Sequence, residues 1–172
     1  MQVFADNHAA TLATLTQVLE GTRGNEEWGN ARDNATAAIG KILVFQPAAS
    51  AGDVGMRLGA LWVNAMPLLH DDTEAAQQHG MLHDQLVKND ARVLGEGQAN
   101  LVKIADVFVR VIGKGSELLK DEATPTFQEF FFKQLLPVLQ EKGFALESAV
   151  TALGVQDQQR FLAAAKANGV GA

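Results

Sequence analysis

The chain has 172 residues, and 47% of them are hydrophobic, which is enough to bury a core in one domain or in a short array of repeats. Its 20 Asp and Glu residues outnumber its 14 Lys and Arg residues and no basic run occurs, so we expect basic protein partners and no direct binding of nucleic acid. The absence of cysteine excludes disulfides and thiolate metal ligands. Without an apolar run of about 20 residues or a secretory signal, the sequence predicts a soluble, intracellular protein with no membrane insertion.

Apolar residues recur at helical spacing through the first quarter of the chain. A first amphipathic helix is predicted over 6–20 from four of them, Leu12, Leu15, Val18 and Leu19. A second is predicted over 32–43, and Pro47 ends it. Glycine inside a helix costs about 1 kcal/mol relative to alanine, so Gly40 predicts close packing against another helix.

Two further helices are predicted on either side of Pro67. The stripe over 53–66 ends at this proline, and a fourth helix follows from about Thr73 to Asn89. Asp71 and Glu74 form an Asp-x-x-Glu pattern, which is typical of a capped helix start.

The second half of the chain predicts four more helices. The segment 98–113 is apolar around most of its circumference and must be covered on several sides. Thr124 and Pro125 are typical of a helix start, and this sixth helix buries four residues, Phe127, Phe130, Phe131 and Leu135. We expect Pro137 to kink or end it, and Phe132 to face a groove or solvent. Short helices over 144–153 and 156–168 complete the chain.

The predicted fold class is all-α, because no credible strand or hairpin turn occurs. Successive helix pairs begin about 45 residues apart, a spacing within the range of HEAT and armadillo repeats. We therefore expect one α-solenoid of antiparallel helix pairs over 1–172, with a short capping pair at the end. The approximate repeats are 6–47, 53–89 and 98–141, followed by the capping pair 143–168.

Three histidines raise the alternative of a small helical metalloprotein. His79 and His83 stand four residues apart on one helix, so they could share a metal ion with His70, Asp71 or Asp72. The Glu of the H-E-x-x-H motif is missing between them. A helical wheel places His79 at the centre of the apolar side, which favours a buried ring with a hydrogen-bond partner over a ligand.

Signals for catalysis are weak. Gly95 to Gly97 and Gly113 to Ser116 partly match phosphate-binding turns, but neither follows a strand, so both are interpreted as turns between helices. No Gly-x-Ser-x-Gly elbow occurs. We predict that the protein is not an enzyme and needs no cofactor.

Several segments resemble one family, in order along nearly the whole chain. They are Arg32–Leu43, Trp62, Met66–Ala75, Val93–Gly95, Asn100–Leu101, Lys103–Ile104 and the final Leu153–Leu162. Together they resemble the C-terminal HEAT repeats of karyopherin-beta nuclear transport receptors (the importin-beta superfamily), of the importin five or importin-beta-three type. The sequence departs from this family at His79 and His83, where relatives carry apolar or aromatic residues, and it lacks the proline of the family's terminal segment.

This resemblance implies a carrier that shuttles between cytoplasm and nucleus. Members of the family bind basic protein cargo on a concave surface and phenylalanine-glycine nucleoporins between outer helices, and they release cargo to Ran-GTP. Ran contacts lie largely in repeats outside this chain, which would then be the C-terminal part of a longer receptor.

In the family the second helix of each pair lines the concave surface, which places five residues toward a partner: Asp33, Asn34, Glu74, Asp84 and Glu129. The alternative for each is a solvated face or a helix cap. A HEAT-type scaffold of a phosphatase or a vesicle coat remains an alternative for the whole chain, although it would not share the segments above.

Overall fold

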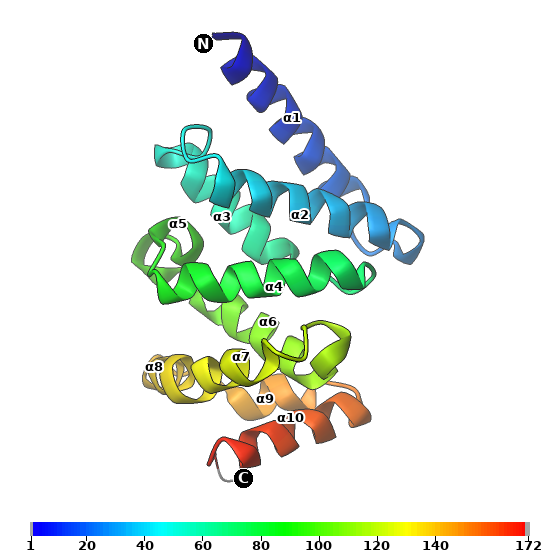
Figure 1. The fold of residues 1–172 in the computed structure, drawn as a ribbon, viewed down its shortest axis with the longest axis vertical. Coiled ribbons are helices and arrows are strands. Elements are labelled where there is room, and N and C mark those ends of the chain that lie inside the picture. Colours follow the sequence, from blue (N-terminus) through cyan, green and yellow to red (C-terminus); the bar gives the residue numbers. More distant parts are fainter. Residues whose placement is uncertain (1, 171–172) are drawn as a thin grey trace. The chain divides into compact units, whose positions relative to one another are not determined.

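The computed structural model describes the backbone of residues 2–170 and the side chains of residues 10–170. Regular structure in this range is entirely helical, which confirms the all-α prediction. No helix there is both long and apolar enough to cross a lipid bilayer. The chain divides into two compact units, Met1–Asn100 and Leu101–Ala172, called here the N-terminal unit and the C-terminal unit (Figure 1).

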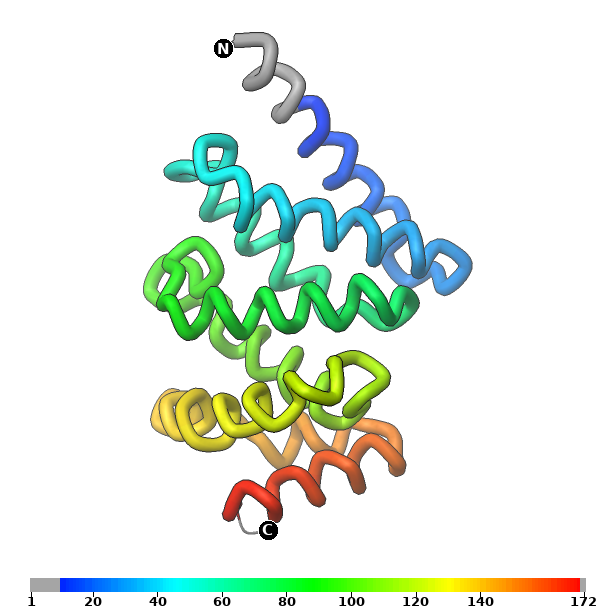
Figure 2. Tube along the Cα trace, viewed as in Figure 1, coloured from blue at the N-terminus to red at the C-terminus, as the bar shows by residue number. Residues whose placement is uncertain are grey.

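The N-terminal unit is built from helices close to those predicted. Its elements are α1 (Gln2–Gly21), η1 (Glu26–Trp28), α2 (Gly29–Phe45), α3 (Gly52–Ala65), α4 (Asp72–Val87), α5 (Ala91–Leu94) and η2 (Glu96–Gln98). Helix α2 packs against α1, α3 and α4, and α3 packs against α5. Figure 2 shows α2 and α4 side by side, with both N-termini toward the same end of the unit.

Gly40 lies where the core of this unit is tightest. A Cβ at Gly40 would collide with the Gln78 side-chain oxygen and the Trp62 indole nitrogen. These two atoms are themselves joined, because Trp62 Nε1 donates a hydrogen bond to Gln78 Oε1 over 2.9 Å, and both side chains are buried. The close packing predicted from Gly40 is therefore confirmed, and it ties α2 to α3 and α4.

The C-terminal unit is organised around the apolar helix α6. Its elements are α6 (Leu101–Lys114), η3 (Gly115–Glu117), α7 (Thr124–Phe130), η4 (Phe131–Leu135), α8 (Leu136–Glu141), α9 (Leu146–Thr151) and α10 (Val155–Ala167). Helix α6 packs against α8, α9 and α10. Phe108 of α6 stacks on Phe127 of α7, with ring centroids 4.0 Å apart. Most of the apolar circumference predicted for this segment is buried, although Val102 is 61% exposed.

Two details of the sixth predicted helix differ from expectation. Thr124 does not cap it, because Thr124 Oγ1 donates a hydrogen bond to the Lys120 carbonyl oxygen and Ala123 occupies the capping position. Phe132 does not face solvent, because only 4% of it is exposed.

The helix also continues past Pro137 rather than ending there. Pro137 is the second residue of α8, which follows the π-helix η4, and the Leu136 N–H donates to the Phe131 carbonyl five residues earlier. A wide turn of this kind rotates the residues that follow relative to an α-helix. Phe131 and Phe132, at the start of this turn, are both buried, and both rings lie near Phe161 of α10.

Candidate functional site

Asp33 lies in the first turns of α2 and is 1% exposed. Its Oδ2 accepts three backbone hydrogen bonds, from the N–H groups of Leu69 at 2.9 Å, His70 at 2.7 Å and Asp71 at 3.2 Å. These donors belong to the turn before α4, so one carboxylate of α2 satisfies three backbone N–H groups of that turn. The prediction that Asp33 faces a partner is wrong, because its side chain is buried inside the unit.

Two of the other predicted partner-facing residues of the N-terminal unit are accessible. Asn34, the next residue of α2, is exposed, and so is Asp84 near the end of α4. Asp84 Oδ1 lies 3.4 Å from Nδ1 of His83. Their contact with a partner stays a prediction.

Glu74 is half-buried and connects α4 to α2. Its Oε1 pairs with Nζ of Lys41 at 2.7 Å, and its side chain is 22% exposed. Its Oε2 is buried and has no hydrogen-bond partner among the described side chains. The ion pair gives Glu74 a structural role between the two helices, whether or not a partner also reaches it.

Glu129 belongs to the C-terminal unit and is exposed. Its Oε1 pairs with Nζ of Lys133 at 2.8 Å, one helical turn away. The hydrogen bond from Lys133, followed by the attraction of its charge, lowers the pKa of Glu129 below its ordinary value. Exposed pairs of this spacing contribute little to stability. Contact of Glu129 with a partner stays a prediction.

His79 has the environment predicted from the helical wheel. It is fully buried, and its Nε2 accepts a hydrogen bond from the Leu68 N–H over 3.3 Å. This hydrogen bond ties the His79 ring of α4 to the turn that precedes the helix. The prediction of a buried histidine with a hydrogen-bond partner is confirmed.

The other two histidines have different neighbours. His70 Nε2 lies 3.5 Å from Oε2 of Glu26, and His83 Nδ1 lies 3.4 Å from Oδ1 of Asp84. Within residues 10–170, no group of three His, Asp or Glu side chains is arranged to hold a metal ion. The geometry therefore gives no support to the metalloprotein alternative.

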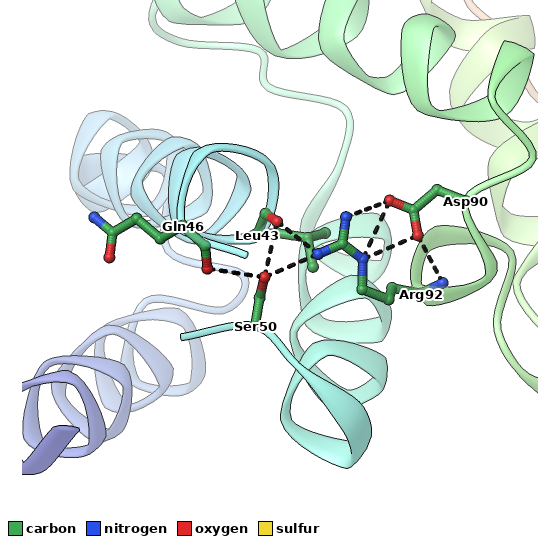
Figure 3. A network of polar contacts seen from close by, with 5 residues as sticks. All are labelled: Leu43, Gln46, Ser50, Asp90 and Arg92. Carbon is green, nitrogen blue, oxygen red and sulfur yellow. Dashed lines mark hydrogen bonds and ion pairs between the residues drawn. The ribbon is translucent and has the colours of Figure 1, made fainter. Parts of the chain in front are cut away.

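Arg92 is the centre of a second polar network in the N-terminal unit (Figure 3). Its Nη1 donates to the carbonyl oxygen of Leu43 at 2.9 Å and to Oγ of Ser50 at 2.8 Å, while its Nε and Nη2 engage both carboxylate oxygens of Asp90. Ser50 Oγ in turn lies 3.0 Å from the carbonyl oxygen of Leu43 and 3.1 Å from that of Gln46, and its single proton can be donated to either. The network joins the end of α2 and the following loop to α5.

The hydrogen bonds between Arg92 and Asp90 shift the pKa values of both side chains. The side-chain hydrogen bond from Arg92 lowers the pKa of Asp90 below its ordinary value, although partial burial opposes this. Asp90 also caps α5 by accepting from the Arg92 N–H at 3.0 Å. The sequence analysis did not identify Arg92. The one local signal was Asp90, which stands two residues before Arg92 at the start of α5.

Helix α2 is thus held to the next helix pair near both of its ends. Asp33 makes the link at the N-terminal end, and Arg92 makes it at the C-terminal end. Between them lie the Lys41–Glu74 ion pair and the packing at Gly40. These contacts connect α2 to α4 and α5 at several points along its length.

Comparison with known proteins assigns no family. No protein-family model matches the chain. No solved structure matches it significantly. The described residues therefore define only a broad class, that of all-helical proteins.

Proposed function

We propose that the chain is the C-terminal part of a HEAT-repeat nuclear import receptor. In this proposal the receptor carries basic protein cargo through the nuclear pore, binds phenylalanine-glycine nucleoporins, and is controlled by Ran-GTP acting on the full-length protein. It shuttles between cytoplasm and nucleus and acts through protein–protein contacts without catalysis. The helix pairs stack as an α-solenoid.

One observation supports the proposal above the others. The two segments with the most extensive resemblance to karyopherins, Arg32–Leu43 and Met66–Ala75, meet in space although they are separated in sequence. Asp33 from the first segment accepts hydrogen bonds from three N–H groups of the second. Neighbouring repeats of one architecture contact each other. If both segments belong to such repeats, a contact between them is expected.

The packing of the N-terminal unit is consistent with stacked pairs. Helix α2 contacts both α1 of its own predicted repeat and α4 of the next. In a solenoid each repeat contacts its neighbours. Polar contacts made by Asp33, by Lys41 with Glu74, and by Arg92 connect the two predicted repeats.

The charge distribution fits a carrier of basic cargo. Residues 1–100 contain 12 Asp and Glu against 6 Lys and Arg, whereas residues 101–172 contain 8 of each. The whole net charge of -6 therefore belongs to the N-terminal unit. An acidic surface steers basic partners and raises their association rate.

Transport is tested with the product of the complete gene, labelled with a fluorophore and added to permeabilised cells. We expect it to accumulate at the nuclear envelope and to enter nuclei without any added carrier, because nucleoporin binding allows passage. An inert labelled protein of equal size is the control and should stay outside. Exclusion of the full-length protein under conditions in which a known import receptor enters would contradict the proposal.

A further inference from the structure

The end of α10 carries a pair of residues that can react with each other. Asn168 is followed directly by Gly169, whereas every other asparagine of the sequence precedes a larger residue. The Asn168 side chain is partly exposed, and Gly169 is exposed. The side-chain carbonyl carbon of an asparagine and the next backbone nitrogen close a five-membered ring when they are joined, so such a pair has a reaction available within its own chain.

The geometry of the helix end explains why glycine follows Asn168. Asn168 is the C-cap of α10, and Gly169 has a φ of 77°, in the left-handed region. The Gly169 N–H donates to the Lys166 carbonyl oxygen over 3.1 Å, and the Val170 N–H donates to that of Ala165 over 3.0 Å. These two bonds form a Schellman motif, which favours glycine at this position. The cap of the helix therefore creates the asparagine–glycine pair.

The reaction of such a pair is deamidation without an enzyme. The backbone nitrogen of Gly169 attacks Cγ of Asn168, and a bond forms between these two atoms. The bond from Cγ to Nδ2 breaks, and Nδ2 leaves as ammonia with the proton that the Gly169 nitrogen gives up. Water then opens the succinimide ring at one of its two carbonyls, which leaves aspartate or isoaspartate. Glycine favours this attack, because it has no Cβ to hinder the approach.

The closed helix end restrains both reacting groups. Asn168 Nδ2 donates a hydrogen bond to the Ala164 carbonyl oxygen over 2.9 Å, which holds the side chain back along the helix. The Gly169 nitrogen is held by its bond to Lys166. Attack requires the nitrogen to give up this bond and the side chain to turn, so the last turn must open first. Helix ends open at a much lower free-energy cost than the whole fold.

We propose that Asn168 is a site of spontaneous deamidation, and that opening of the last turn of α10 sets its rate. The reaction consumes only water, so it proceeds in the isolated protein. Its product places a negative charge at the C-terminal end of a helix, where the macrodipole disfavours it. The product also lacks the Nδ2 donor to Ala164, so each event weakens the cap and favours further opening.

The modification acts on a helix that covers α6. Helix α10 packs against α6, and Ala164 and Ala165 near its end are buried. A weakened cap lets this end open more often, so the buried alanines are exposed more often in the modified chain. The inference concerns the chemistry of the chain itself and does not rest on the proposed transport function.

The site is tested by ageing the 172-residue chain in neutral buffer and mapping its asparagines by peptide mass spectrometry, with chromatography to separate isoaspartate from aspartate. We expect Asn168 to convert at least about tenfold faster than Asn34 and Asn64, which are exposed and precede alanine. A synthetic peptide of residues 161–172 should convert about five- to fiftyfold faster than the folded chain, because no helix cap restrains it. Conversion of Asn168 no faster than that of Asn34 and Asn64 would overturn the proposal.

Control by the helix end is tested with a matched pair of glycine variants. Ala167→Gly loosens the last turn of α10, and Ala152→Gly makes the same change at the C-cap of α9; both positions are exposed, so the fold is retained. We expect Ala167→Gly to convert about three- to fivefold faster than the parent chain, because glycine disfavours the helix, and Ala152→Gly to convert at the parent rate. The same Ala167→Gly change in the synthetic peptide should have little effect. Equal rates for the folded parent and Ala167→Gly, or for the folded chain and the peptide, would overturn the proposal that the helix end sets the rate.

Discussion

The Asp33 carboxylate accepts a 2.7 Å hydrogen bond from the backbone N–H of His70, which lies 37 positions further along the chain. The same oxygen accepts from Leu69 and Asp71. A single buried side chain of α2 therefore determines the position of the turn from which α4 starts.

Removal of this carboxylate should destabilise the protein strongly. Asp33→Ala leaves three N–H groups without their acceptor, and we expect a loss of about 3 kcal/mol or more in the free energy of unfolding, measured by urea titration. Asp33→Asn keeps one acceptor oxygen and should lose less. The control is Asn34→Ala at the exposed neighbour, which should stay within about 0.5 kcal/mol of the parent. A small loss for Asp33→Ala would contradict the structural role given to Asp33.

Arg92 should not be replaceable by lysine. The guanidinium donates at once to Asp90, to Ser50 and to the carbonyl of Leu43, and one ammonium group cannot reproduce this fork. We expect Arg92→Lys to lower the free energy of unfolding by about 1–3 kcal/mol, because buried acceptors lose donors. Arg57→Lys, at an exposed arginine of α3, is the comparison and should be neutral; equal stability of the two variants would count against the network.

Acid should weaken the Asp90–Arg92 link within a defined pH window. The pKa of Asp90 is lowered in the folded protein, so its ionised form stabilises the fold fully above its ordinary value near 3.8. The contribution disappears as the pH falls further, through the lower pKa of the folded state. Urea titrations of the parent and of Asp90→Asn, from pH 7 to pH 2, should show a stability difference that shrinks below about pH 4. If the difference in unfolding free energy between the parent and Asp90→Asn did not change with pH, the ionised Asp90 carboxylate would not be its source.

Substitution of alanine for two glycines, Gly40 and Gly80, should change the stability of the protein in opposite directions. At Gly40 a Cβ collides with Trp62 and Gln78, and we expect Gly40→Ala to cost about 1–3 kcal/mol through overpacking. Gly80, inside α4, has open space around the same position, so Gly80→Ala should stabilise the protein by about 0.5–1 kcal/mol. Thermal unfolding of both variants measures this, and a stabilising Gly40→Ala would refute the close approach of the helices.

What the sequence predicted correctly depends on local spacing. Helices followed from periodicity, the cap from Asp71 lying three residues before Glu74, and the burial of His79 from its place on the apolar side of one helix. Asp33 was misassigned because its donors lie 36 to 38 positions away. Arg92 was missed because its partners Ser50 and Leu43 lie 42 and 49 positions away, so no motif connects them.

The Phe131 and Phe132 pair shows a different reason for error. Within the run of three phenylalanines that begins at Phe130, Phe132 was expected to face a groove or solvent. Both rings pack near Phe161 of α10. Helical periodicity within one segment does not show that a helix later in the chain covers it.

The most direct measurement for the proposed transport function uses the full-length protein from the complete gene with an immobilised basic cargo. Ran loaded with a non-hydrolysable GTP analogue is added, and the released receptor is quantified, with Ran-GDP as the control. We expect Ran-GTP to bind the receptor and displace it from cargo, while Ran-GDP does neither. Failure of Ran-GTP both to bind and to displace any cargo would contradict the assignment of this chain to a nuclear import receptor.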